Sequence, residues 1–242
     1  MTSETQPKTP PGKQENMLIN LLFNIVLPAI ILSKLSPENR LGPVYALIVG
    51  LSLPLGYGIY DLVTRKKWNF FSILGFISIL LTGGLGLLKV DGIWFAVKEA
   101  AIPLLLGIAV ICSLKTKYPL VRTFLYNDQI IDVDKVHRTL VLRDNENAFD
   151  KLLVSSTYVL AFSFLLSAIL NFILARVILK SPSGSVEFTQ ELGKMTALSW
   201  PVIVIPSTIV MAYALWRLFA GIKRLTGLGM EDVFKTPPPK EK

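Results

Sequence analysis

The stretch GGLGLLKVDGIWFAVKEAAIPLLLGIAVICSL (residues 83–114) decides the fold class, because it joins a glycine-rich end, a short charged turn and a long apolar run. A helix needs about 20 apolar residues to cross a bilayer core of about 30 Å, and the run that begins at Ile93 has that length. Lys98 and Glu99 stand side by side near its start. Ionised side chains inside a bilayer are expensive and tend to mark functional sites. We therefore expect a membrane helix that carries an intramembrane polar site.

The composition of the whole chain also indicates a membrane protein. Of its 242 residues, 52% are hydrophobic and 17% are charged, whereas soluble proteins carry about 25% charged residues. The net charge of +8 does not require nucleic acid as a partner, because lysines and arginines gathered on one side of a membrane give the same total. We expect the chain to lie in a lipid bilayer and to bind no nucleic acid.

Six apolar runs predict an all-α, polytopic transmembrane helix bundle. The predicted spans cover residues 17–35, 41–63, 68–88, 93–114, 152–179 and 195–220, within a transmembrane domain over 17–221. The polar, proline-rich residues 1–16 predict a disordered tail, and residues 222–242 predict a second tail.

The connection over residues 115–151 is the longest polar segment between spans. Its runs 119–127 and 147–154 mix apolar and charged residues at helical spacing, which favours interfacial amphipathic helices. The segment between them carries both signs of charge, and we expect His137 there to be a solvated loop residue.

The distribution of basic residues predicts the topology. Six spans place both termini on one side, and that side receives 18 of the lysines and arginines against 7 on the other, which sums to the 25 of the chain. Basic residues favour the cytoplasmic side. We therefore expect both termini, and the 115–151 loop, in the cytoplasm of a bacterial cell, with the spans in its inner membrane.

The ionisable residues in the spans form the first site hypothesis. Lys98 and Glu99 point about 100° apart on a helix, so we expect that they cannot form a good pair with each other. Arg176 lies in the second half of the fifth span, at a depth similar to that of Glu99 in the predicted topology. The sequence predicts an ion pair between Glu99 and Arg176.

The amides and glycines of the spans extend this hypothesis. Asn20 and Asn24 are four residues apart and share a helix face; with Asn171, they either bond to neighbouring helices or line a polar pathway. Small residues let helix backbones approach closely, so we expect close packing at three glycines: Gly83, Gly84 and Gly86.

The sequence offers little for catalysis or metal binding. Cys112 is the single cysteine and His137 the single histidine, and metal and nucleotide motifs such as HExxH, CxxC pairs, GxGxxG and the P-loop are absent. We expect no catalytic residues, no metal and no cofactor.

Three pieces of the chain resemble the bacterial intracellular septation protein A family. They are YALIVGLSLPLGYGIYDLVTRKKW (45–68), TGGLGLLKVDGIWFAVK (82–98) and KTKYPLVRTFL (115–125). Lys98 matches the lysine that follows the turn in that family, and Asn171 matches an asparagine of its penultimate helix. Glu99, Pro103, the loop 126–150 and the N-terminal tail depart from the family pattern. The resemblance implies a role in upkeep of the cell envelope, with cell-division or wall-synthesis membrane proteins as partners.

Two functions remain open. One is a non-enzymatic envelope protein that acts through protein or lipid contacts, which fits the lack of catalytic motifs. The alternative is a small-molecule or ion transporter built on the intramembrane polar residues, with prolines and glycines that break its helices. Six spans would need a homo-oligomer, at least a dimer, to enclose such a pathway.

Overall fold

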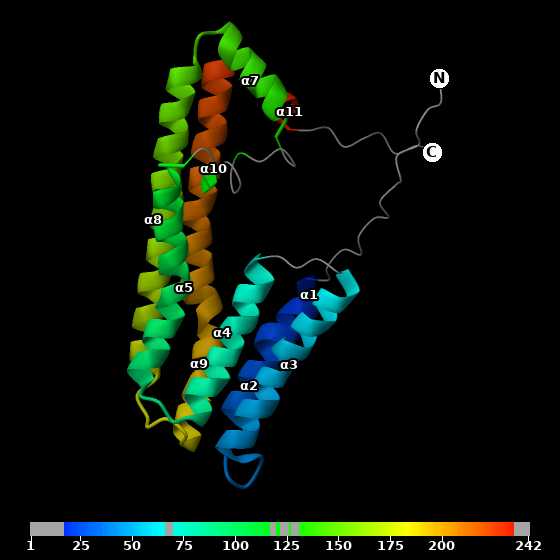
Figure 1. The fold of residues 1–242 in the computed structure, drawn as a ribbon. Coiled ribbons are helices and arrows are strands. Elements are labelled where there is room, and N and C mark those ends of the chain that lie inside the picture. Colours follow the sequence, from blue (N-terminus) through cyan, green and yellow to red (C-terminus); the bar gives the residue numbers. More distant parts are fainter. Residues whose placement is uncertain (1–16, 66–69, 117–119, 122–125, 127–130, 235–242) are drawn as a thin grey trace, which may run out of the picture. The chain divides into compact units, whose positions relative to one another are not determined.

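The computed structural model describes residues 17–65, 70–116, 120–121, 126 and 131–234. These residues are helical apart from turns and an isolated β-bridge between Ile131 and Phe234, so the predicted all-α class is confirmed (Figure 1). The chain divides into two compact units. Unit 1 contains residues 1–95 and 176–197, and unit 2 contains residues 96–175 and 198–242.

The helices follow the predicted apolar runs. The helices of the first 116 residues are α1 (Met17–Leu21), η1 (Leu22–Val26), α2 (Leu27–Lys34), α3 (Gly42–Arg65), α4 (Phe70–Leu87) and α5 (Gly92–Ser113). The later ones are α7 (Val133–Leu142), α8 (Glu146–Ile178), α9 (Val186–Ser199), η2 (Trp200–Val204), α10 (Ile205–Thr226) and α11 (Met230–Val233).

Four helical segments within the described residues are long and apolar enough to cross a membrane. They are Gly42–Tyr60, Gly92–Ser113, Glu146–Ile178 and Val186–Thr226; Leu18–Lys34 and Ile77–Leu87 are shorter apolar helices. These segments indicate a membrane protein. Six spans and cytoplasmic termini remain predictions, and the tail over residues 1–16 lies outside the described residues.

Two segments that the sequence assigned to loops are helical, and a third, the predicted amphipathic run 147–154, is the beginning of a long helix. Residues 133–142 form α7, with His137 in its middle. The sixth apolar helix begins at Val186 and not near residue 195, and α8 begins at Glu146 and not near residue 152. Ser185 caps α9, because its Oγ accepts the N–H of Phe188 at 3.0 Å. These starts are polar, so a search for apolar runs places them too late.

Both π-helical segments end two residues before a proline. η1 ends at Val26 and is followed by Pro28, and η2 ends at Val204 and is followed by Pro206. A proline ring clashes with the carbonyl four residues earlier, and the wider turn of a π-segment relieves that contact. These segments interrupt two otherwise continuous helices, residues 17–34 and 186–226.

In unit 1, α3 packs against both α2 and α4, and glycines bring helices together. A Cβ atom at Gly193 of α9 would lie 2.7 Å from the backbone nitrogen of Ser33 and 2.9 Å from the carbonyl oxygen of Ala29 in α2. A Cβ atom at Gly50 would lie 3.1 Å from Leu32. The absence of a side chain at Gly193 lets α9 touch the backbone of α2, and at Gly50 it makes room for the side chain of Leu32.

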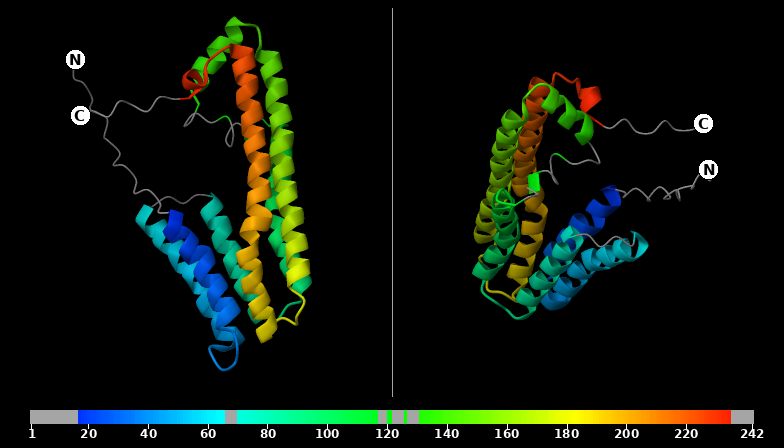
Figure 2. Two further views of the ribbon diagram at one scale, coloured as in Figure 1. Left: turned by 180° about the vertical axis from the view of Figure 1, so that it is seen from behind. Right: turned by 45° about the horizontal axis from the view of Figure 1, so that its top comes forward.

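In unit 2, α8 and α10 run side by side in opposite directions, and α7 lies across their ends (Figures 1 and 2). Gly227, with φ of 70°, ends α10 in the left-handed conformation, which glycine adopts without steric cost. The main core of this unit lies at that end.

Candidate functional site: intramembrane polar residues and the cap

Lys98 and Glu99 form an ion pair with each other. Lys98 Nζ lies 2.7 Å from Glu99 Oε1, and the two side chains are 8% and 23% exposed. The prediction that these neighbours cannot pair was wrong, because the four-carbon stem of lysine lets its ammonium group swing across the 100° between the two positions. The pair brings two opposite charges into α5 together.

The pair predicted between Glu99 and Arg176 joins residues of different units. Glu99 belongs to unit 2, and Arg176 is an exposed residue of unit 1. This pairing stays a prediction, while the contact between Glu99 and Lys98 gives the carboxylate a cation on its own helix.

The intramembrane asparagines have hydrogen-bond partners within their own helices. Asn24 donates its Nδ2 hydrogen to Asn20 Oδ1 at 3.1 Å. Asn171 donates to the carbonyl oxygen of Ser167 at 2.8 Å, one turn earlier in α8. Asn20 and Asn24 lie in unit 1, whereas Asn171 lies in unit 2 with Lys98 and Glu99. The six candidate residues are thus divided between the units, and local bonds satisfy several of their polar groups.

The three glycines near the end of α4 differ in their surroundings. A Cβ atom at Gly86 would lie 2.7 Å from Leu47 of α3, and one at Gly83 would lie 3.3 Å from Leu51. Nothing lies within 4 Å of a Cβ atom at Gly84. Gly83 and Gly86 face α3, and Gly84 points into open space.

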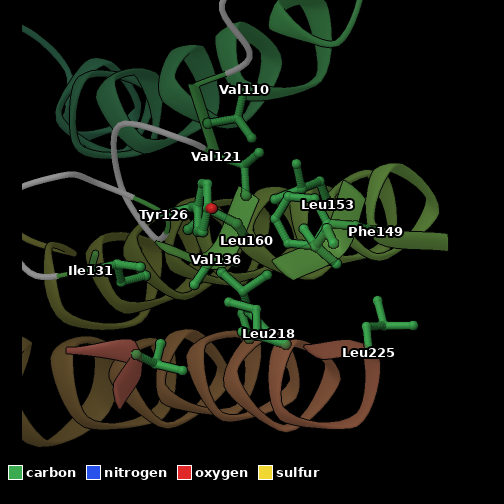
Figure 3. Packing of buried hydrophobic residues seen from close by; sticks show 14 of the residues in the cluster. Val110, Val121, Tyr126, Ile131, Val136, Phe149, Leu153, Leu160, Leu218 and Leu225 are labelled. Atoms are coloured by element: carbon green, nitrogen blue, oxygen red, sulfur yellow. The ribbon is translucent and has the colours of Figure 1, made fainter. Parts of the chain in front are cut away.

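A folded cap covers the end of α8 and α10. We define the cap as the described residues of 120–145 and 227–234. Its apolar side chains join those of α5, α8 and α10 in one buried cluster, in which Tyr126 stacks edge-on against Phe149 with ring centres 5.1 Å apart (Figure 3). Val136 and Leu140 point inward from α7, and Val121 and Ile131 are fully buried. The cap is therefore a packed structure.

Polar contacts fix the cap to the rest of unit 2. Asn145, between α7 and α8, donates from Nδ2 to the carbonyl oxygen of Leu225 at 2.8 Å. Lys135 Nζ of α7 lies 2.5 Å from Asp232 Oδ1 of α11. The hydrogen bond and the charge of Lys135 hold the pKa of the Asp232 carboxyl below its usual value. These contacts join segments about 80 to 97 residues apart in the chain.

The helix α7 was not predicted from the sequence as a site element, although a local signal for it exists. Asp132 caps the helix by accepting the N–H of Lys135 at 3.0 Å. Val133, Val136 and Leu140 then recur at helical spacing. The predicted amphipathic run 119–127 falls mostly on residues outside the described part of the chain, whereas 147–154 is the beginning of α8.

The described residues bring no three metal-ligating side chains together. His137 is exposed, and its Nδ1 lies 3.9 Å from Glu146 Oε1. Comparison of the chain with protein-family models, curated proteins and solved structures gives no match.

Proposed function

We propose that this chain is a non-enzymatic protein of the bacterial cell envelope, embedded in the inner membrane, that acts through contacts with proteins or lipids. The cap is the observation that carries this proposal. It gives the membrane helices a folded surface on which a partner can bind. The resemblance to the septation protein A family points to the same kind of role.

The outer face of α7 supplies the partner surface in this proposal. Val136 and Leu140 are turned inward, whereas Val141 is 50% exposed and Leu142 is 85% exposed. Arg138 and Arg143 are exposed beside them. Exposed apolar side chains next to cations are typical of the contact points of protein interfaces. We expect a partner segment that is both apolar and acidic.

A transporter is the second candidate, and the Lys98–Glu99 pair favours it. Ionisable residues in membrane helices commonly lie on substrate or proton pathways. Against this role, the two charges compensate each other, and Asn24 and Asn171 donate to partners on their own helices. A structural role accounts for such local pairs without a transported species.

Complementation of a strain that lacks the gene separates the two functions. In the contact role, Glu99→Gln restores the wild-type cell envelope. At equal protein level, Leu142→Asp fails to restore it and loses specific partners on co-purification. Ala148→Asp is the control, since Ala148 is exposed in the first turn of α8, where an acidic residue is tolerated. Loss of function with Glu99→Gln alone at unchanged protein level, together with a gradient-dependent uptake in vesicles, would favour the transporter.

A further inference from the structure

Two apolar grooves on the outside of unit 2 share one wall. The larger has a volume of about 570 Å³ and lies between α8 and α10; its lining consists of Tyr158, Val159, Phe162, Ile209, Val210 and Tyr213. The smaller, of about 220 Å³, lies between α5 and α8. Tyr158 and Phe162 line both grooves, so they form a ridge between them.

The ridge and the groove walls face outward. Tyr158 is 56% exposed, Phe162 is 54% exposed and Ile209 is 63% exposed. Gly107 lines the smaller groove, and α5 and α8 approach closely there, because a Cβ atom at Gly107 would lie 3.3 Å from Phe164. On a membrane protein, such open apolar grooves are filled by hydrocarbon. Two parallel grooves on either side of a ridge fit the two acyl chains of one lipid.

The grooves lead toward the headgroup level of the membrane. Residues 152–175 of α8 and residues 195–216 of α9, η2 and α10 carry no charged side chain. On the cap side these uncharged runs end at Lys151 and at Arg217. At 1.5 Å per residue, the 20 steps from Ala175, the last uncharged residue before Arg176, to Ser155 cover about 30 Å, the thickness of a bilayer core. Ser155 and its hydrogen-bond partner Arg217 then lie at one surface of that core, and Tyr158 lies one turn inside it.

Arg217 is placed at the end of the larger groove. It donates from Nη2 to Ser155 Oγ at 2.6 Å, one turn beyond Tyr158 on α8. Tyr213 and Trp216 contact each other with ring centres 5.9 Å apart, as in the aromatic belt of membrane proteins. The ion pairs among the described residues are Lys98–Glu99, Lys135–Asp232 and His137–Glu146. Arg217 is exposed, and it belongs to none of these ion pairs.

Further cations continue this face beyond the groove. Lys151 precedes Ser155 by four residues on α8, and Arg224 follows Arg217 by seven residues on α10. These spacings place each residue on the same side of its helix as its neighbour. The face therefore changes from apolar at Phe162 and Ile209, through tyrosine, to basic.

We propose that the two grooves and Arg217 form a binding site for one anionic diacyl phospholipid from the leaflet at the cap end. One acyl chain lies in each groove, on either side of the ridge, and the phosphate accepts hydrogen bonds from Arg217. Arginine has five N–H donors, so its bond to Ser155 leaves others for the phosphate, which it binds in a bidentate manner. This site names one lipid contact within the proposed contact role. Of that proposal, it rests only on the statement that the chain spans a membrane.

Native mass spectrometry of the purified full chain tests the site. Phosphatidylglycerol is titrated against phosphatidylcholine with the same acyl chains. We expect the wild type to prefer phosphatidylglycerol and Arg217→Gln to bind it about tenfold more weakly, as expected for the loss of a charge-assisted hydrogen bond. Lys223→Gln is the matched control, because it removes the same charge from another face of α10. Val210→Trp fills the larger groove and should also weaken binding, whereas Met211→Trp, outside the groove, should not.

Equal binding of the two lipids by the wild type, or equal losses in Arg217→Gln and Lys223→Gln, would overturn the lipid site. A second copy of the chain held on the ridge in place of lipid would overturn it as well. Thermal unfolding of each variant in detergent shows that the fold is intact. Because the lipid titration does not depend on the complementation assay, failure of the site leaves the contact role standing, and failure of that role leaves the lipid preference measurable.

Discussion

Lys98 and Glu99 are adjacent in the sequence and are ion-pair partners in the structure, with Nζ and Oε1 2.7 Å apart. The pair lies in α5, whose other residues are uncharged. Removing one partner from a buried pair leaves an uncompensated charge, and this costs more than removing both. The pair is thus a structural element whose two members depend on each other.

We expect Glu99→Gln to lower the free energy of unfolding by about 2 kcal/mol, somewhat less than a fully buried pair would lose, because the two paired side chains are 8% and 23% exposed and solvent reaches the pair. Lys98→Met should cost a similar amount. The double variant should lose less than the sum of the two single losses, because it leaves neither charge behind. Thermal and denaturant unfolding in detergent measure these losses.

The same cycle with Arg176→Gln tests the pair predicted from the sequence. If Glu99 is held by Lys98, the losses in Glu99→Gln and Arg176→Gln should add, as they do for independent sites. Strictly additive losses for Lys98 and Glu99, with strong coupling between Glu99 and Arg176, would contradict the local pair.

Gly193→Ala should destabilise the protein, whereas Gly84→Ala should not. A Cβ atom at position 193 would meet the backbone of Ser33 and Ala29, and backbone atoms cannot rotate away as a side chain does. We expect a loss of about 1–3 kcal/mol, as for overpacked cores. At Gly84 nothing lies within 4 Å, and alanine should raise helix stability by up to about 1 kcal/mol. The difference in melting temperature between the two variants is the measurement, and similar melting temperatures would contradict the close contact.

Much of the fold could be predicted because apolar runs specify membrane helices locally. The run 93–114 corresponds to α5, Gly92–Ser113, and the run 41–63 corresponds to α3, Gly42–Arg65. The cap was not predictable in this way, because its contacts join residues such as Asn145 and Leu225. No local pattern reports a contact between segments so far apart in the chain.

The site was only partly predictable, for reasons of side-chain geometry. The angle of about 100° between successive helix residues predicts that Lys98 and Glu99 point apart. It does not take into account the length of the lysine side chain, which lets Nζ reach Glu99. Likewise, a cluster of glycines predicts close packing without saying which members face a neighbour, as Gly84 and Gly86 illustrate. Side-chain rotamers and helix rotation decide both cases.

The contact between Lys135 and Asp232 should make the cap sensitive to acid. The pKa of Asp232 is lowered in the folded protein from its usual value of 3.8. The stabilising contribution is therefore fully present above pH 3.8, and it is lost as the pH falls through the lower, folded value. Hydrogen exchange of α7 and α11 between pH 6 and pH 2 should show this loss in the wild type. In Asp232→Asn the exchange rates, corrected for their intrinsic pH dependence, should not show this loss of protection at low pH. The same loss in the variant and in the wild type would assign it to another group.

Glu191 should stabilise the turn between α8 and α9. Its carboxylate accepts the backbone N–H groups of Lys180 and Ser181 at 2.9 and 3.0 Å, and the hydroxyl of Ser181 at 2.9 Å. Hydrogen bonds to a charged group contribute about 1.5–3 kcal/mol, so Glu191→Ala should lower the free energy of unfolding by about 2 kcal/mol. Glu187→Ala is the control. Glu187 is exposed in the first turn of α9, where its charge interacts favourably with the helix dipole, a contribution of about 0.3–1 kcal/mol. Equal losses in the two variants would mean that the carboxylate of Glu191 acts only as a charge near the helix start, whereas a larger loss at Glu191 means that its three hydrogen bonds hold the turn.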